Sequence, residues 1–208
     1  MPSLKVYRDA LLKEGLICEE NINEINDVQY ISYDSNDIRP NTLFVCKGAH
    51  FKEEYLKSAM EKGVCCYISE KKYSVEANCI IVSDIRRSMG IIVNIYYEDI
   101  WKKFNLIGIT GTKGKSTTAY FIKYILDEYL SEKKKPQSGI ISSINTYDGV
   151  ESFESHLTTP EPFDLHRHFK NAADSGIEYV TMEVSSQALK YERVYGVEFT
   201  VGCYLNIG

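Results

Sequence analysis

The stretch Leu106-Ile-Gly-Ile-Thr-Gly-Thr-Lys-Gly-Lys-Ser-Thr-Thr118 decides the fold that this sequence predicts. Its first residues form a short apolar strand, Gly111 to Ser116 form a glycine loop, and a helical pattern follows from Thr117. Glycines in such a loop let successive N–H groups point at phosphate oxygens. The start of the helix adds free N–H groups and the positive end of its dipole. The stretch therefore predicts a nucleotide phosphate site.

Two side chains of this loop suit ATP and its magnesium ion. Lys115 supplies a mobile cation for the β and γ phosphates, and the Ser116 hydroxyl is a hard oxygen ligand for Mg²⁺. The common P-loop spacing would place glycine where this chain has Ile109, and Gly108 comes one residue early. We interpret the loop as an ATP site of a variant P-loop class; a plain glycine turn is the alternative. The expected ATP-binding residues are Gly111, Thr112, Lys113, Gly114, Lys115, Ser116 and Thr117.

Composition limits the possible partners. The chain has 208 residues, of which 44% are hydrophobic and 25% charged, and a net charge of -5. These values describe a globular protein without a basic footprint, so we expect no nucleic-acid partner. No apolar run reaches membrane-spanning length and the start of the chain lacks a signal-peptide core, so we expect no membrane partner and a cytoplasmic location. The six cysteines lack paired metal spacing and are expected to be reduced and buried.

The order of the predicted elements indicates two domains. Alternating strands and helices make residues 1–99 an α/β domain, and residues 100–105 look like a linker in which Trp101 is a packing residue. Residues 106–208 form a second domain that begins with the phosphate-site strand. Strands that alternate with helices imply a mainly parallel, doubly wound sheet.

A carboxylate is expected beside the phosphate loop. The strand from Ile177 to Met182 delivers Glu183, and ligands collect at the carboxyl ends of parallel strands. We therefore predict that Glu183 is a second Mg²⁺ ligand beside Ser116, and that Lys115 and Glu183 are the catalytic residues. A glutamate that merely reaches solvent past a strand end is the alternative.

The histidines carry less information. His166 and His168 are two residues apart on a predicted helix, so they do not share a face and make a poor metal pair. We expect surface positions for both. His50 follows Lys47-Gly48 in a loop that is a candidate ligand contact.

Four separate motifs, in the family's order along essentially the whole chain, resemble one family. Residues 110–116 are similar to the ATP loop of the Mur ligases and the related folylpolyglutamate synthetases. Residues 182–189 with Arg193 are similar to a signature of the Mur ligases that add the third peptide residue, the UDP-N-acetylmuramoyl-tripeptide synthetases (MurE type). Residues 33–45 resemble the UDP-binding domain of that family, and Thr158-Thr159-Pro160 also has a counterpart there.

The resemblance implies site residues in both domains. The uridine end of the substrate would contact Tyr33, Ser35, Ala49, His50 and Phe51. The muramoyl-dipeptide end would be held by Thr158, Thr159, Ser185 and Arg193. The implied architecture is a small UDP-binding α/β domain followed by a partial P-loop ATPase domain.

The resemblance also implies a reaction. In the family, ATP activates the D-glutamyl carboxylate of UDP-N-acetylmuramoyl-L-alanyl-D-glutamate as an acyl phosphate, and the amine of a diamino acid attacks to form an amide. Asn36, Gln187 and Tyr191 depart from residues that are common in the family. The chain stops just before the family's Asp-His segment, so we expect an amino-terminal portion without turnover of its own. The diamino acid would be chosen by the domain beyond Gly208.

Alternative functions remain open from the sequence. One is a non-catalytic module that binds a UDP-sugar-peptide, and others are another amide ligase of the folylpolyglutamate-synthetase type or a different P-loop NTPase. A parallel sheet that ends early would expose a strand edge, so we also expect self-association through the second domain.

Overall fold

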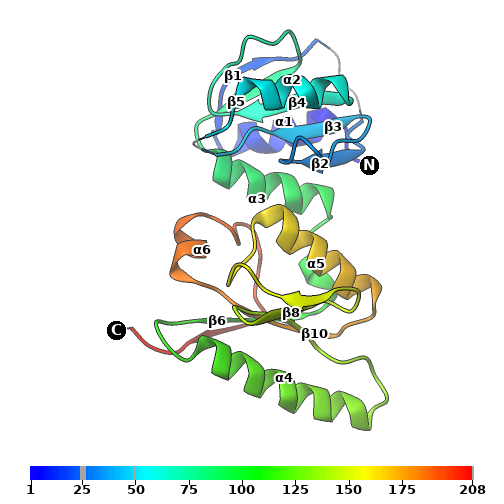
Figure 1. Cartoon of the computed structure of the whole chain (residues 1–208), viewed down its shortest axis with the longest axis vertical. Helices are drawn as coiled ribbons and strands as arrows, with labels where there is room; N and C mark the ends of the chain where they lie inside the picture. Colours follow the sequence, from blue (N-terminus) through cyan, green and yellow to red (C-terminus); the bar gives the residue numbers. More distant parts are fainter. Residues whose placement is uncertain (24–26, 49, 208) are drawn as a thin grey trace. The chain divides into compact units, whose positions relative to one another are not determined.

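The computed structural model describes residues 1–23, 27–48 and 50–207. The chain divides into two compact units, Met1–Tyr96 and Tyr97–Gly208, and each is a mixed α/β layer structure (Figure 1). Among the described residues, no helix is both long and apolar enough to cross a membrane.

The first unit is built on a five-stranded sheet in the order β1-β5-β4-β3-β2. Neighbouring strands are parallel except that β1 runs antiparallel to β5. Its elements are α1 (Leu4–Lys13), β1 (Ile17–Asn21), β2 (Tyr30–Ser32), β3 (Thr42–Val45), α2 (Glu53–Glu61), β4 (Val64–Ser69), β5 (Cys79–Val82) and α3 (Ile85–Tyr96).

Helical spacing predicts α1 correctly. Leu4, Tyr7 and Leu11 are fully buried, and Gly15 has a φ of 68° just past the end of the helix. Strand β1 was not predicted, because its residues Cys18–Asn21 are exposed and largely charged or polar. It is an edge strand that pairs with β5 through its backbone, so its side chains carry little strand signal.

The second unit is built on a six-stranded sheet in the order β11-β6-β10-β7-β8-β9. The strands from β11 to β7 are parallel, as predicted, and β8 and β9 add an antiparallel hairpin that was not. Its elements are η1 (Ile100–Lys103), β6 (Asn105–Thr110), α4 (Lys115–Glu132), β7 (Gly139–Ile141), β8 (Asn145–Tyr147), β9 (Ser152–Glu154), α5 (Pro162–Asp174), β10 (Tyr179–Glu183), α6 (Ser186–Lys190) and β11 (Val201–Tyr204).

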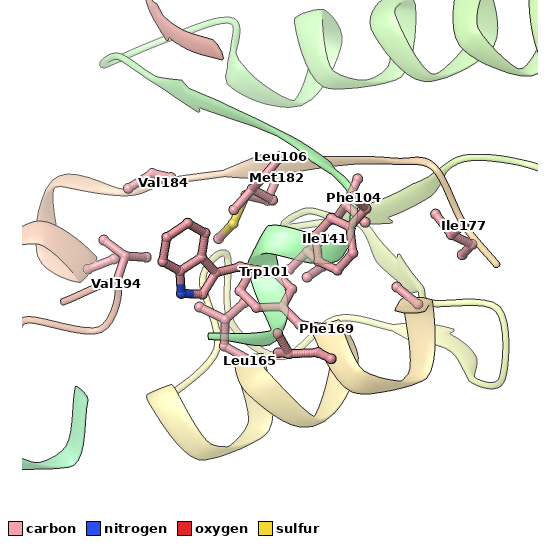
Figure 2. Close-up of a cluster of buried hydrophobic side chains, with 14 residues drawn as sticks. Trp101, Phe104, Leu106, Ile141, Leu165, Phe169, Ile177, Met182, Val184 and Val194 are labelled. Carbon is pink, nitrogen blue, oxygen red and sulfur yellow. The ribbon is translucent and has the colours of Figure 1, made fainter. Parts of the chain in front are cut away.

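The main core of this unit lies between the sheet and α5. Phe104 packs on Phe169, and Trp101 and Met182 lie in the same buried cluster (Figure 2). Trp101 is thus a packing residue, as predicted. Residues 100–105 are not a free linker, since Ile100, Trp101 and Phe104 belong to this core. Their apolar side chains gain more by burial there than in an exposed connection.

Helix α4 covers the opposite face of the sheet (Figure 1). It buries Ala119 against Ile109 and Ile140. Phe121, Tyr124 and Ile125 on the same helix are 64–70% exposed, so the apolar surface of α4 is wider than the stripe that packs on the sheet.

Candidate functional site

Three loops of the second unit meet at one edge of its sheet. Strands β6, β10 and β7 are parallel neighbours, and their register pairs Glu183 with Ile109 and Met182 with Ile141. The residues that follow these positions therefore emerge side by side at the carboxyl ends of the strands, where ligands of such sheets bind.

The phosphate loop requires its two glycines. Gly111 has a φ of 150° and Gly114 a φ of 84°, and Gly114 is the N-terminal cap of α4. A Cβ atom on Gly111 would lie 3.1 Å from Leu205 Cβ, which is tighter than ordinary contact. Glycine at both positions lets the chain turn sharply from β6 into α4.

The departure from common P-loop spacing has a packing explanation. Ile109 is fully buried in the small core under α4, so position 109 belongs to the strand and not to the loop. A Cβ atom on Gly108 would lie 2.5 Å from the ring of Phe199. Gly108 is therefore a glycine of close packing, and the phosphate loop begins only at Gly111.

The N–H groups of the loop divide into two sets. Those of Thr112 and Lys113 donate to Asn206, at 3.3 Å to its carbonyl oxygen and 3.1 Å to its Oδ1. The N–H groups of residues 114–117 lie at the start of α4, where a helix leaves its donors unpaired. An anion would thus meet residues 114–117, together with Lys115, whose Nζ donates to the Gly111 carbonyl at 2.8 Å.

Ser116 and Glu183 are brought together by Ser143. Glu183 Oε1 accepts hydrogen bonds from Ser143 N at 2.9 Å and from Ser143 Oγ at 3.2 Å. Ser143 Oγ lies 3.0 Å from Ser116 Oγ. A hydroxyl and a carboxylate are the hard oxygen donors that Mg²⁺ prefers, and both lie beside the cationic end of the phosphate loop. The donor set therefore fits a magnesium ion.

The predicted dipeptide-binding residues lie next to Glu183. Thr159 is fully buried, and its Oγ1 donates to the Glu183 carbonyl at 2.9 Å and accepts from Ser185 N at 3.1 Å. Ser185 Oγ accepts from Ala188 N at 3.1 Å as the cap of α6. Arg193 donates to the Thr159 carbonyl at 3.0 Å. The buried Thr159 thus joins Glu183, Ser185 and Arg193 at this corner of the site.

Thr158, Ser185 and Arg193 are the more accessible members of this group, since only Thr159 is buried. Arg193 Nη2 lies 2.8 Å from a carboxylate oxygen of Glu161, and its side chain is 13% exposed. Thr158 is half-buried. Ser185 is half-buried too, so a substrate would meet these three residues directly.

In the first unit, the predicted uridine contacts line a single hollow. It has a volume of about 570 Å³, and Tyr33, Ser35, His50 and Phe51 are in its wall. The loops after β2 and β3 form it, because these parallel strands end at the same edge. Ala49 lies outside the described residues.

Polar groups in this hollow complement its aromatic wall. The Asn36 N–H donates to Asp34 Oδ1 at 2.9 Å, which sets the turn that carries Ser35. Lys47 Nζ lies 5.3 Å from the centre of the Tyr33 ring. Phe51 packs on Phe44, with 6.0 Å between ring centres. The hollow thus offers aromatic faces and a cation, which suits a nucleotide with a charged diphosphate.

The surface positions expected for His166 and His168 are wrong. Both are buried, because the His166 ring packs against Tyr97 and Phe169 and the His168 ring packs against Phe153 of β9. His166 Nδ1 donates to the Pro162 carbonyl at 2.9 Å, and burial lowers its pKa to about 4. His168 Nδ1 donates to Asp148 Oδ2 at 2.6 Å.

Asp148, Glu151 and His168 form a cluster that the sequence did not indicate as a metal site. Their ligand atoms lie within 4.8 Å of one another. However, Asp148 already accepts bonds from Val150 N, Glu151 N, Asn171 Nδ2 and His168 Nδ1. Arg167 holds both oxygens of Glu151 at 2.7 Å. The cluster ties the hairpin to α5.

Two residues of the site escaped the sequence analysis. Ser143 lies 40 positions before Glu183, and Asn206 lies 93 positions after Lys113. Both are in turns or loops at the ends of strands, where ligand-site residues gather in parallel sheets. A place at the end of a strand was the signal that the sequence offered for these two residues. Only the strand order shows which of these turns faces the phosphate loop.

Comparison of the sequence with known proteins gives one family, and a solved structure shares the fold. Residues 109–208 match the model of the Mur ligase middle domain. The UDP-N-acetylmuramoyl-L-alanyl-D-glutamate–L-lysine ligase of Enterococcus faecalis is 43% identical over 99% of this chain and 42% of its own length. The UDP-N-acetylmuramyl-tripeptide synthetase of Lactobacillus acidophilus is 40% identical over 86% of this chain and 35% of its own length.

A solved structure of UDP-N-acetylmuramoyl-L-alanyl-D-glutamate–2,6-diaminopimelate ligase has the same fold, with a TM-score of 0.70 and 22% identity over 90% of this chain and 39% of that one. The chain belongs to the Mur ligase family. Its relatives in this comparison are ligases of the MurE type, and the chain spans less than half of their length.

Proposed function

We propose that this chain supplies the UDP-substrate-binding and ATP-binding units of an ADP-forming ligase that adds the third amino acid to UDP-N-acetylmuramoyl-L-alanyl-D-glutamate. One observation carries the proposal: the glycine loop with Lys115 and Ser116 converges with the buried carboxylate of Glu183 at one sheet edge. The names of the relatives at 40–43% identity support the choice of substrate.

In this proposal, the phosphate groups of ATP bind at the start of α4. The N–H groups of residues 114–117 and the Lys115 ammonium contact phosphate oxygens. Gly111, Thr112 and Lys113 give the loop its shape. Ser116 and Glu183 would hold Mg²⁺, which when bound neutralises charge on the transferred phosphoryl group.

The muramoyl substrate is proposed to use residues of both units. Tyr33, Phe51 and Lys47 would receive the uridine diphosphate by ring stacking and charge. Ser35, Ala49 and His50 are proposed contacts from the same loops. Thr158 and Arg193 would hold the dipeptide, and Arg193 suits its carboxylate because a guanidinium binds carboxylates in a forked geometry. Ser185 would also contact the dipeptide, and Thr159 would keep these groups in place.

The proposed reaction has two steps. An oxygen of the D-glutamyl carboxylate attacks the γ-phosphorus of ATP and displaces ADP, which forms an acyl phosphate. The amine of a diamino acid then attacks the acyl carbon, phosphate leaves, and the amine loses a proton as the amide forms. The named relative from Enterococcus faecalis uses L-lysine, and we propose a diamino acid of this class here. ATP and a soluble nucleotide-linked precursor fit a cytoplasmic step of peptidoglycan synthesis.

Calorimetric titration of the 208-residue chain with UDP-N-acetylmuramoyl-L-alanyl-D-glutamate, with and without Mg·ATP, tests the proposal. We expect both ligands to bind, Lys115→Ala to weaken only the nucleotide, and Tyr33→Ala to weaken only the muramoyl ligand. Binding of nucleotide without the muramoyl ligand would favour another amide ligase or P-loop NTPase. Binding of the muramoyl ligand without nucleotide would favour the non-catalytic module.

A further inference from the structure

Ser143 occupies a turn that places it between two elements of the site. The turn joins β7 to β8, and β7 is the parallel neighbour of β10, the strand that ends in Glu183. Ser142 holds the turn, because its Oγ donates to the Asn145 carbonyl at 2.9 Å and accepts from the N–H groups of Ile144 and Asn145 at 3.1 Å. Within the residues that the structure describes, the Ser143 hydroxyl bonds to Glu183 and Ser116 and not to the turn.

The donor and the acceptor can be assigned in both hydrogen bonds of the Ser143 hydroxyl. A carboxylate only accepts, so the single hydroxyl proton of Ser143 goes to Glu183 Oε1 at 3.2 Å. Ser143 Oγ must then accept the proton of Ser116 Oγ, which lies 3.0 Å away. The hydroxyl proton of Ser116 therefore points at Ser143, and the lone pairs of Ser116 Oγ are left for a cation.

The two oxygens of the Glu183 carboxylate have different partners. Oε1 accepts both bonds from Ser143, and within the described part of the chain no donor is bonded to Oε2. The residue is 1% exposed, so its carboxylate is held inside the site. Oε2 is thus the oxygen of this enclosed carboxylate that is available to a cation.

We infer that Ser143 is a positioning residue for a divalent cation at this site: it fixes Glu183 through Oε1, takes the Ser116 proton, and so presents Glu183 Oε2 and Ser116 Oγ as a preformed pair of ligands. This inference rests on the proposed function, in which nucleotide and Mg²⁺ bind here. Ser143 itself does not touch the cation. Groups that orient metal ligands typically change metal affinity about 10–100-fold when they are removed.

The test compares nucleotide binding with and without Mg²⁺. Ser143→Ala keeps the N–H bond to Glu183 Oε1 but removes the hydroxyl, and Ser143→Thr keeps the hydroxyl. The matched control is Ser155→Ala, which removes a hydroxyl bond of 2.9 Å to Thr146 on the neighbouring hairpin and leaves Glu183 and Ser116 unchanged. Calorimetry gives the Kd of ADP in EDTA and in Mg²⁺, and a Mg²⁺ titration at saturating ADP gives the apparent metal affinity.

We expect Ser143→Ala to weaken the apparent Mg²⁺ affinity about tenfold and to leave the Kd of ADP in EDTA unchanged. Ser143→Thr should restore the metal affinity, and Ser155→Ala should not change it. If the unaltered chain binds ADP with a clear Mg²⁺ dependence and Ser143→Ala shows the same dependence, the role of Ser143 is overturned. If the unaltered chain binds no nucleotide under either condition, the proposed function itself fails, and with it this inference.

Discussion

Asn206 and Lys113 form a reciprocal pair: Asn206 Nδ2 donates to the Lys113 carbonyl at 3.1 Å, and the Lys113 N–H donates to Asn206 Oδ1 at 3.1 Å. Asn206 follows β11, and Lys113 lies in the middle of the phosphate loop after β6. The loop is thus held from a neighbouring strand, which fixes its backbone before a nucleotide arrives.

We predict that Asn206→Ala weakens ADP binding about tenfold. The variant loses two hydrogen bonds of about 1 kcal/mol each that hold the phosphate loop. Part of the free energy of ADP binding is then used to order the loop. Asn105→Ala is the matched control, because Asn105 Nδ2 donates to the Glu178 carbonyl at 3.2 Å at the opposite end of β6. Calorimetry with ADP measures both variants, and an equal loss for the two would contradict the role of Asn206.

Gly108→Ala should destabilise the second unit by about 1–3 kcal/mol, because its Cβ would lie 2.5 Å from the Phe199 ring. Trp101, the only tryptophan, lies in the core of this unit and reports its unfolding in urea by fluorescence. The control is Gly202→Ala in β11, where an added Cβ meets no atom within 4 Å. A second substitution, Phe199→Leu, should restore part of the loss. Equal stabilities for the Gly108 and Gly202 variants would disprove the packing explanation.

The sequence predicted those parts of the site that depend on local pattern. The strand, loop and helix around Gly111 are contiguous in the chain, and the rule for parallel strands then places Glu183 at the same edge. Ser143 and Asn206 were missed because their roles depend on strand order, with the pairs β7–β10 and β6–β11. Helical spacing placed His166 and His168 on different faces of one helix, but it did not indicate that both faces are buried.

The buried imidazole of His166 predicts a specific pH dependence. Burial lowers its pKa to about 4, against 6.5 for an ordinary histidine, even though the bond to the Pro162 carbonyl and the charge of Asp99 act in the opposite direction. The unfolded chain therefore binds more protons than the folded chain between these values. The stability linked to neutral His166 is fully present above pH 6.5 and is lost as the pH falls toward 4.

The difference between the pKa of His166 in the folded and in the unfolded chain corresponds to about 3 kcal/mol of unfolding free energy for the second unit. His166→Gln keeps a donor for the Pro162 carbonyl but does not titrate, so we expect lower stability at pH 7 and a shallower decline toward acid. Urea unfolding followed by Trp101 fluorescence at several pH values measures both proteins. Parallel pH profiles for the two would show that His166 does not contribute.

Strand β11 should cause the 208-residue chain to self-associate. It pairs with β6 on one side, and none of the described strands pairs with its other side. Val201 and Tyr204 on this strand are 52% and 65% exposed. An open strand edge with apolar side chains offers backbone groups and surface to a second copy. We therefore expect the mass measured by light scattering to rise with protein concentration.

A charge on the strand should suppress this association, since lysine on an edge strand opposes pairing with another chain. Val201→Lys is expected to give a monomer at concentrations where the unaltered chain associates. Leu12→Lys is the matched control, because Leu12 is 51% exposed on α1 of the first unit. If both substitutions reduce association equally, general solubility explains the effect, and if the unaltered chain stays monomeric throughout, the open edge of β11 does not drive self-association.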